Sequence, residues 1–219
     1  MKSLLLVAIL AGGFLAWALL TPFQGFASDT FVEIPRGTGT AAIAQELARQ
    51  KVIQYPWQFW LARLIQPSAK LQAGEYRFSK AASVNEVFAR IARGDIYYFE
   101  FTVPEGSNIF DIAKSLEEQS VMKQDEFLRA AEDPGLIRDL APQAKTLEGF
   151  LFPSTYRLTH ATTAPELCKM MTGEFRRQWT KLGTEGADAR RAVTLASLVE
   201  KETAAPEERP LIASVFTNR

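Results

Sequence analysis

The chain has few of the side chains on which many enzyme chemistries depend. Its 219 residues include one cysteine, Cys168, and one histidine, His160. A single cysteine excludes an intramolecular disulfide and a multi-cysteine metal site, and a single histidine excludes a histidine-rich zinc site. A Ser-His-Asp triad or a Cys-His dyad would have to use His160. Carboxylates are therefore the main source of acid–base chemistry in this sequence.

The chain also lacks an excess of charge of either sign. Lys+Arg and Asp+Glu both number 25, which gives a formal net charge of zero. A protein that binds duplex nucleic acid needs surplus basic residues for the phosphates, so this balance argues against a nucleic-acid partner. Hydrophobic residues make up 47% of the chain, as in ordinary globular proteins, and 219 residues give room for two modest domains.

One long segment near the N-terminus, Leu4 to Leu20, contains no charged residue. Its length lies at the short end of the range for a transmembrane helix and at the long end for the core of a signal peptide. In the second case the segment Gly25-Phe26-Ala27 would serve as the cleavage site. We favour an uncleaved anchor because the apolar run exceeds the usual signal core of ~7–15 residues. Both interpretations place Lys2 in the cytoplasm and the chain after residue 28 on the outer side of the membrane.

A pattern repeats within the remaining sequence. Pro35 matches Pro104 and Gly37 matches Gly106, at an offset of 69 residues (104 − 35). In each copy a short β-branched and aromatic stretch precedes Pro-x-Gly, and a Ser or Thr suited to cap a helix follows it. Apolar residues then recur at helical spacing. These matched positions are Ile43-Ala44 with Ile112-Ala113, Leu47 with Leu116, Gln50 with Gln119, and Val52 with Val121.

A second match lies later in each copy. Tyr76-Arg77-Phe78 resembles Tyr156-Arg157-Leu158 at an offset of 80 (156 − 76), so the second copy carries about eleven extra residues (80 − 69) before this strand. Each copy predicts the order strand–helix–helix–strand–helix, and hence an α+β fold with short mixed sheets. The pattern is a common scaffold element, and it also resembles the LysM-type module, which binds glycan strands of peptidoglycan.

Three aromatic residues follow the first copy. Trp57, Phe59 and Trp60 could stack on sugar rings. We interpret them as core residues, because aromatic side chains in such positions are more often buried than used for binding.

Residues 188–203 contain neither Gly nor Pro and predict a helix with two glutamates near its end. The apolar residues on one helical face are Leu195, Leu198 and Val199. Glu202 falls on this face, whereas Glu200 lies off it. Desolvation on an apolar face disfavours the charged carboxylate and would keep Glu202 protonated, ready to donate a proton. The alternative is a helix end whose glutamates are simply solvated.

Three ordered motifs in this chain resemble those of the YceG-like endolytic murein transglycosylases. They are residues 195–203 (LASLVEKET) with Glu208-Arg209 and residues 213–219 (ASVFTNR), residues 147–156 (LEGFLFPSTY), and residues 73–78 (AGEYRF). The resemblance covers the whole chain. The chain departs from it at Ser154, where the family usually has Asp. Family members continue beyond Asn218-Arg219, so the chain resembles an N-terminal fragment, and we expect it to have little or no activity by itself.

The resemblance implies a single-pass enzyme of the bacterial inner membrane whose body faces the periplasm or cell exterior. The expected organisation is an anchor and linker (1–28), a LysM-like module (29–98) and an incomplete catalytic domain (99–219). Such lytic transglycosylases are carbon–oxygen lyases. They cleave the β-1,4 bond between N-acetylmuramic acid and N-acetylglucosamine in nascent glycan strands and leave 1,6-anhydro-N-acetylmuramic acid ends. The implied partners are glycan strands, the inner membrane and cell-wall synthesis proteins.

The same resemblance assigns roles to residues of this chain. Glu202, the second glutamate of Glu-Lys-Glu, is the expected catalytic acid and base. The expected substrate-binding residues are Glu148, Tyr156, Glu200, Arg209 and Asn218. The reaction needs no metal and no cofactor, because the C6 hydroxyl of the sugar attacks C1 in place of water.

Two other functions remain open at this point. A non-catalytic, LysM-like peptidoglycan-binding or scaffold protein of the elongation machinery would need the repeat but not Glu202. A hydrolase would use water and a second carboxylate, Glu148 or Glu200. The products distinguish the three functions, because they are anhydro ends for the lyase, reducing ends for the hydrolase and no cleavage for the scaffold.

Overall fold

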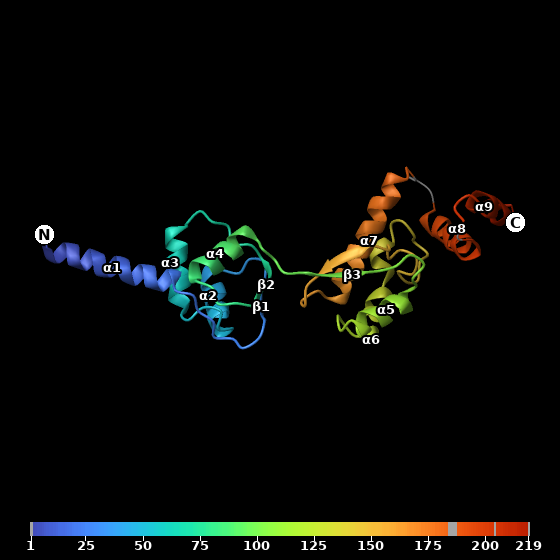
Figure 1. The fold of residues 1–219 in the computed structure, drawn as a ribbon. Coiled ribbons are helices and arrows are strands. Elements are labelled where there is room, and N and C mark those ends of the chain that lie inside the picture. Colours follow the sequence, from blue (N-terminus) through green and yellow to red (C-terminus); the bar gives the residue numbers. More distant parts are fainter. Residues whose placement is uncertain (1, 184–187, 204, 219) are drawn as a thin grey trace. The chain divides into compact units, whose positions relative to one another are not determined.

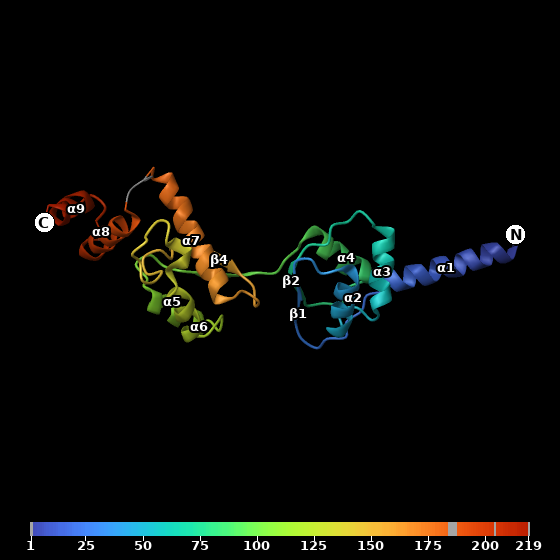
Figure 2. The same cartoon turned by 180° about the vertical axis from the view of Figure 1, so that it is seen from behind.

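The computed structural model describes residues 2–183, 188–203 and 205–218, and the chain divides into two compact units, Met1–Tyr98 and Phe99–Arg219. Figures 1 and 2 show the helices and the small sheet of each unit from opposite sides. The first unit contains α1 (Lys2–Leu20), β1 (Thr30–Ile34), α2 (Thr40–Arg49), α3 (Pro56–Ile65), β2 (Gly74–Phe78) and α4 (Val84–Arg93). The second contains β3 (Phe99–Thr102), α5 (Ile109–Glu118), α6 (Gln124–Ala131), the 3-10 helix η1 (Pro134–Ile137), β4 (Thr155–Leu158), α7 (Ala164–Lys181), α8 (Ala189–Glu202) and α9 (Arg209–Thr217).

The order strand–helix–helix–strand–helix occurs in both units, which confirms the predicted α+β class and the internal repeat. The prediction of mixed sheets is wrong, because β1 pairs with β2 and β3 pairs with β4, each pair antiparallel. Two helices between the strands return the chain to the end at which the first strand finished, so the second strand runs in the opposite direction. Val32 lies opposite Tyr76, and Phe101 lies opposite Tyr156, so the two sheets have the same register at the offsets expected from the sequence.

The Pro-x-Gly turn that precedes the first helix is built in the same way in both units. Thr38 Oγ1 donates a hydrogen bond to the carbonyl of Pro35 at 2.7 Å, and Ser107 Oγ donates to Pro104 at 2.8 Å. These hydroxyls therefore stabilise the turn. The prediction that they cap the helices is wrong. The N-caps are instead the next residues, Gly39 and Asn108.

The helices α2 and α5 also end in the same way. Lys51 and Ser120 adopt left-handed backbone conformations, with φ of 57° and 56°. The amide of the next residue then bonds back to a carbonyl of the last helical turn, Val52 to Leu47 at 2.9 Å and Val121 to Leu116 at 2.8 Å. This is the hydrogen-bond pattern of a Schellman C-cap, here with a residue other than glycine at the left-handed position.

Each unit has its own hydrophobic core. The predicted helix positions Ile43, Ala44 and Leu47 are buried in the first core, and their counterparts Ile112, Ala113 and Leu116 are buried in the second. This burial confirms that the repeated apolar residues are structurally equivalent.

The aromatic residues of α3 do not all belong to the core. Phe59 is fully buried, but the side chains of Trp57 and Trp60 are 40% and 46% exposed. The prediction of core positions is therefore right for Phe59 alone. Trp57 and Trp60 are three residues apart and share the solvent-facing side of α3, whereas Phe59 lies on the side that faces the core.

The end of the N-terminal helix α1 contacts α3 of the same unit, where the side chain of Gln58 donates a hydrogen bond to the carbonyl of Ala18 at 3.0 Å. Among the described residues, no helix combines the length and apolar character required to span a membrane. The predicted membrane anchor in residues 4–20 is therefore not supported by the structure.

Candidate active site

The second unit differs from the first by an insertion between α6 and β4. This insertion contains η1 and the loop of residues 138–154, and therefore the sequence motif around Glu148. Glu148 Oε2 accepts a hydrogen bond at 2.9 Å from the amide of Ile109, the first residue of α5. The free amides and partial positive charge of a helix N-terminus favour a carboxylate at this position. Glu148 thus fixes the loop to the N-terminus of α5.

The same loop packs against α8. Gly149 has a left-handed backbone (φ 82°), and a Cβ atom at this position would lie 2.7 Å from Cγ1 of Val193 on α8. Arg190 of α8 also donates a hydrogen bond to the carbonyl of Gln143 at 3.1 Å, and Ala189 is buried in the core of the second unit. Glycine at position 149 therefore permits an approach of loop and helix that a side chain would prevent.

A cavity of about 560 Å³ lies between the N-terminal turn of α5, the loop, the end of α7 and one side of α8. Its apolar wall includes Phe152 and Trp179, and its polar groups include Asn108, Glu148, Glu200 and Arg209. We call this space the main cavity. Its volume and its mixture of an apolar wall with a few charged groups are typical of sites that bind organic ligands.

Three charged residues of the main cavity, Glu148, Glu200 and Arg209, already have partners. Glu200 Oε2 lies 3.7 Å from Nη2 of Arg209, and both side chains are nearly half exposed. Glu148 is bonded to the N-terminus of α5. The exposed Glu200–Arg209 pair contributes little stability, so it can open when a polar ligand enters.

The structure brings three of the predicted site residues together. Glu148, Glu200 and Arg209 line the main cavity, and Glu202 and Asn218 are not part of its described lining. Asn218 is instead the exposed C-cap of α9.

Tyr156, another predicted substrate-binding residue, lies in the core. Its side chain is only 5% exposed, and its hydroxyl donates a hydrogen bond to the carbonyl of Phe152. Burial raises the pKa of this phenol, with the neighbouring charge of Glu174 adding to the effect. The structure thus places Tyr156 away from the described cavity, because alternate residues of β4 point toward the core.

Glu202 is the last residue of α8, as expected, but its environment differs from the one predicted. Its side chain is exposed, and Leu198 on the same face is 43% exposed. Val199 is buried at 6%, so the apolar face of α8 is only partly covered by the described residues. The predicted desolvation of Glu202 is therefore not found in this structure, and its catalytic role remains a prediction.

Cysteine chemistry has no place in this site. Cys168 is buried in α7, and burial raises the pKa of its thiol to about 12, so the nucleophilic thiolate is scarce at neutral pH. In the portion of the chain that the structure describes, no group of three or more His, Cys, Asp and Glu residues could hold a metal ion.

Comparison with known proteins identifies the family. The model of the YceG-like family matches residues 32–219. The chain belongs to the YceG-like family. This confirms the resemblance that the three sequence motifs indicated.

Two relatives of this YceG-like chain carry the name endolytic murein transglycosylase. The one from Bacillus subtilis (strain 168) is 27% identical over 233 residues, which cover 96% of this chain and 65% of that protein. The one from Streptococcus pneumoniae serotype 2 (strain D39 / NCTC 7466) is 25% identical over 218 residues, which cover 86% of this chain and 40% of that protein. The chain therefore spans less than two thirds of the length of either relative.

A solved structure is also similar to this YceG-like chain. It is the 2.6 Å crystal structure of a yceG-like protein from Listeria monocytogenes, with 25% sequence identity and a TM-score of 0.48. The match covers 88% of this chain and 70% of that chain.

The main cavity of the YceG-like chain is also lined by two residues that the sequence analysis missed. Trp179 and Asn108 both line it. Trp179 lies near the C-terminal end of α7, where its ring stacks on Phe175 with 5.9 Å between the ring centroids. The sequence signal was weak for both residues, because an aromatic residue on an amphipathic helix and an Asn at a helix N-cap ordinarily have structural roles.

Proposed function

We propose that this YceG-like chain belongs to an endolytic peptidoglycan lytic transglycosylase. The reaction would cleave the β-1,4 bond between N-acetylmuramic acid and N-acetylglucosamine within a glycan strand and leave a 1,6-anhydro-N-acetylmuramic acid end. Membership of the YceG-like family and the name shared by its relatives support this proposal. The relatives extend well beyond the matched region, so the proposal concerns the whole protein to which this chain corresponds.

The observation that carries the proposal is the main cavity. It lies beside the C-terminal end of α8, the helix that contains Glu200 and Glu202, and its lining joins carboxylates to an apolar wall with Trp179. Sugar rings combine apolar faces with polar edges, so they fit a site in which an aromatic surface adjoins charged hydrogen-bonding groups.

The proposed mechanism uses Glu202 as the only proton carrier. Its protonated carboxyl donates a proton to the glycosidic oxygen as the bond to C1 of N-acetylmuramic acid breaks. The C6 hydroxyl of the same sugar then attacks C1, and its proton returns to the Glu202 carboxylate. No water is consumed, and the enzyme ends the cycle in its starting protonation state. Glu202 is exposed in this structure, so binding of the strand must remove water from it.

A hydrolase is the second candidate, and one observation favours it. Glu148 and Glu200 line the same cavity, and a hydrolytic glycosidase needs two carboxylates on either side of the scissile bond. Both carboxylates already have partners, the amide of Ile109 and the guanidinium of Arg209. These contacts favour binding and positioning roles for the two glutamates over a role in activating water.

The decisive experiment compares Glu202→Gln with Glu200→Gln in the full-length protein. Both changes remove one negative charge from the same helix end, so each is a control for the other. Removal of a positioned proton donor typically costs ~10²–10⁴-fold in rate. We expect Glu202→Gln to abolish anhydro ends in mass spectra of the digested glycan, and Glu200→Gln to have a milder effect.

Each other outcome contradicts part of the proposal. Reducing ends in place of anhydro ends would identify a hydrolase. A greater loss with Glu200→Gln than with Glu202→Gln would move the acid to the residue that lines the cavity. Activity that survives both changes would refute catalysis by this helix, and absence of cleavage by the unaltered protein would favour the LysM-like binding or scaffold function.

The location of the protein and its protein partners also remain predictions. We propose that the body of the chain faces the cell wall, because the glycan strands that it would cleave lie outside the inner membrane. Membrane fractionation followed by intact-mass measurement tests this placement, and a protein recovered wholly from the cytoplasm would contradict it.

A further inference from the structure

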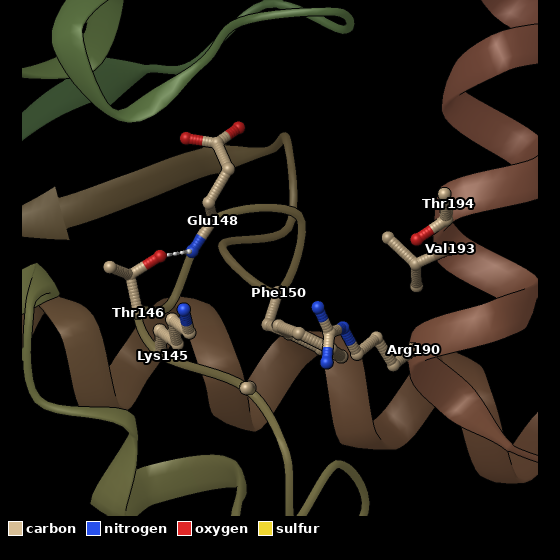
Figure 3. Close-up of a pocket in the computed structure, with 8 residues that line it drawn as sticks. Lys145, Thr146, Glu148, Phe150, Arg190, Val193 and Thr194 are labelled. Atoms are coloured by element: carbon tan, nitrogen blue, oxygen red, sulfur yellow. Dashed lines mark hydrogen bonds between the residues drawn. The ribbon is translucent and has the colours of Figure 1, made fainter.

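A second, smaller cavity adjoins the main cavity. It has a volume of about 200 Å³ and lies between the 144–150 loop and α8. Glu148 and Val193 line both cavities, so the two spaces are neighbours within the second unit. Figure 3 shows Val193 and Thr194 on α8 facing the loop, and the side chain of Arg190 extending from α8 toward the loop. We call this space the cationic cavity.

The cationic cavity presents hydrogen-bond donors and two positive charges. Lys145 and Arg190 line it from opposite elements, the loop and the helix, and neither forms an ion pair with another described residue. Arg190 uses one N–H group to bind the carbonyl of Gln143, which orients the guanidinium and leaves its other N–H groups available. The hydroxyls of Thr146 and Thr194 lie in the same lining.

Glu148 is the one acidic residue in this lining. Its Oε2 atom accepts the hydrogen bond from the amide of Ile109 at 2.9 Å. Figure 3 shows its carboxylate turned away from Arg190. Thr146 Oγ1 accepts a hydrogen bond from the Glu148 amide at 3.2 Å, so the hydroxyl proton of Thr146 remains free for a ligand. The donors of the cavity therefore outnumber its acceptors, which suits an anionic group.

We propose that the cationic cavity binds a carboxylate of the peptide stem that is attached to N-acetylmuramic acid. This inference rests on the proposed function. The N-acetylated sugars of the glycan backbone are uncharged, whereas the stem carries free carboxylates. A site for the stem beside the site for the sugars would select strands that still carry their peptides. Arginine is well suited to this role, because its planar guanidinium can bind a carboxylate through two parallel hydrogen bonds.

The size of the cationic cavity agrees with binding of a stem carboxylate there and of the sugars in the main cavity. Its volume of about 200 Å³ is well below the 560 Å³ of the main cavity, so it suits the end of one side chain or a chain terminus and not a disaccharide. The sugars would occupy the main cavity, and one carboxylate of the stem would reach past Glu148 and Val193 into the cationic cavity.

The test measures binding of the purified full-length protein to two forms of uncrosslinked glycan strand by calorimetry. One form keeps its peptide stems, and the other has been stripped of them by an amidase. We expect the unaltered full-length protein to bind the stem-bearing strand roughly tenfold more tightly, the effect typical of one charge-assisted contact. Arg190→Ala and Lys145→Ala should each reduce this preference without weakening binding of the stripped strand.

Arg191→Ala is the matched control. Arg191 follows Arg190 on α8 and carries the same charge, but it does not line the cationic cavity. It should leave the preference unchanged, and Arg190→Lys should keep part of it. Thermal unfolding of each variant shows whether the second unit is intact.

The outcomes separate failure of this inference from failure of the proposed function. Equal binding of the two strands by the unaltered full-length protein would overturn the inference and leave the proposed function standing. Equal losses in Arg190→Ala and Arg191→Ala would also overturn it, because they would indicate nonspecific attraction. If neither strand binds, the proposed substrate is wrong and both proposals fail.

Discussion

Gly149 offers the most direct test of how the active-site loop is held against α8. Replacement by alanine has two separable effects. The left-handed backbone (φ 82°) would be strained by any side chain, at a cost of about 1–2 kcal/mol. The new Cβ atom would also lie 2.7 Å from Cγ1 of Val193, and overpacking of this kind typically costs about 1–3 kcal/mol. We therefore expect Gly149→Ala to lower the free energy of unfolding of the second unit by about 2–5 kcal/mol.

Gly106→Ala is the matched control for the backbone contribution. Gly106 has a similar φ of 75°, but an added Cβ would meet no atom within 4 Å. Gly106→Ala should therefore lower the free energy of unfolding only by the backbone strain of about 1–2 kcal/mol. Val193→Ala removes the atom that meets the new Cβ, so the double variant Gly149→Ala/Val193→Ala should be more stable than Gly149→Ala by itself. Such recovery isolates the contact between loop and helix.

Urea unfolding measures these differences. The fluorescence of Trp179 reports on the second unit when Trp17, Trp57 and Trp60 are replaced by phenylalanine in every variant. Amide exchange along α8 provides a second measurement, because a helix displaced by the new methyl group should exchange faster. If Gly149→Ala and Gly106→Ala have the same cost, or if Val193→Ala brings no recovery, then the loop and α8 do not pack as the structure shows.

Two further predictions concern stability. Ser120→Gly should raise the melting temperature of the second unit by several degrees, because glycine relieves about 1 kcal/mol of strain at the left-handed position that ends α5 (φ 56°). Ser115→Gly, within α5, should lower the melting temperature by a similar amount. Equal effects of the two changes would contradict the assignment of Ser120 to the end of the helix. Hydrogen bonds from Arg176 lower the pKa of Asp139 to about 2, below the unfolded value of about 3.9, so the ion pair stabilises the fold above pH ~4 and this contribution is lost as the pH falls toward 2. Asp139→Asn should therefore lower the melting temperature at pH 7 and not at pH 2. The decrease should be small, because the ion pair is largely exposed. A difference that persists at pH 2 would show that the decrease does not come from the ion pair.

Much of the fold could be predicted from the sequence because its signals are local. The offset between Pro35 and Pro104 predicted the repeat, and the structure reproduces it in the turns, the helix ends and the sheet register. The hydroxyls of Thr38 and Ser107 show the limit of such reasoning. A Ser or Thr after a turn suits a helix cap, but here both hydroxyls bond to the preceding proline carbonyl, and the helix begins one residue later.

The candidate site could be predicted only in part. The motifs identified the family and pointed to Glu148, Glu200 and Arg209, which the structure places in one cavity. Periodicity alone predicted that Glu202 would be shielded from solvent, but shielding depends on which elements cover α8, and the described residues cover it only in part. Tyr156 belongs to a site motif, yet the pairing of β4 with β3 directs it into the core.

The sequence by itself determined the helices, the strands, the turns and the family, because turn chemistry, apolar spacing and motif order act over short stretches of chain. Only the tertiary structure decided which carboxylates meet in a cavity, that the insertion of the second unit forms the wall of this cavity, and that Lys145 and Arg190 face one smaller space. These positions depend on packing between segments about 40 or more residues apart, such as the Ile109 amide with Glu148 and Gly149 with Val193. Contacts at such distances follow from how the elements fill space together, and no local pattern specifies them.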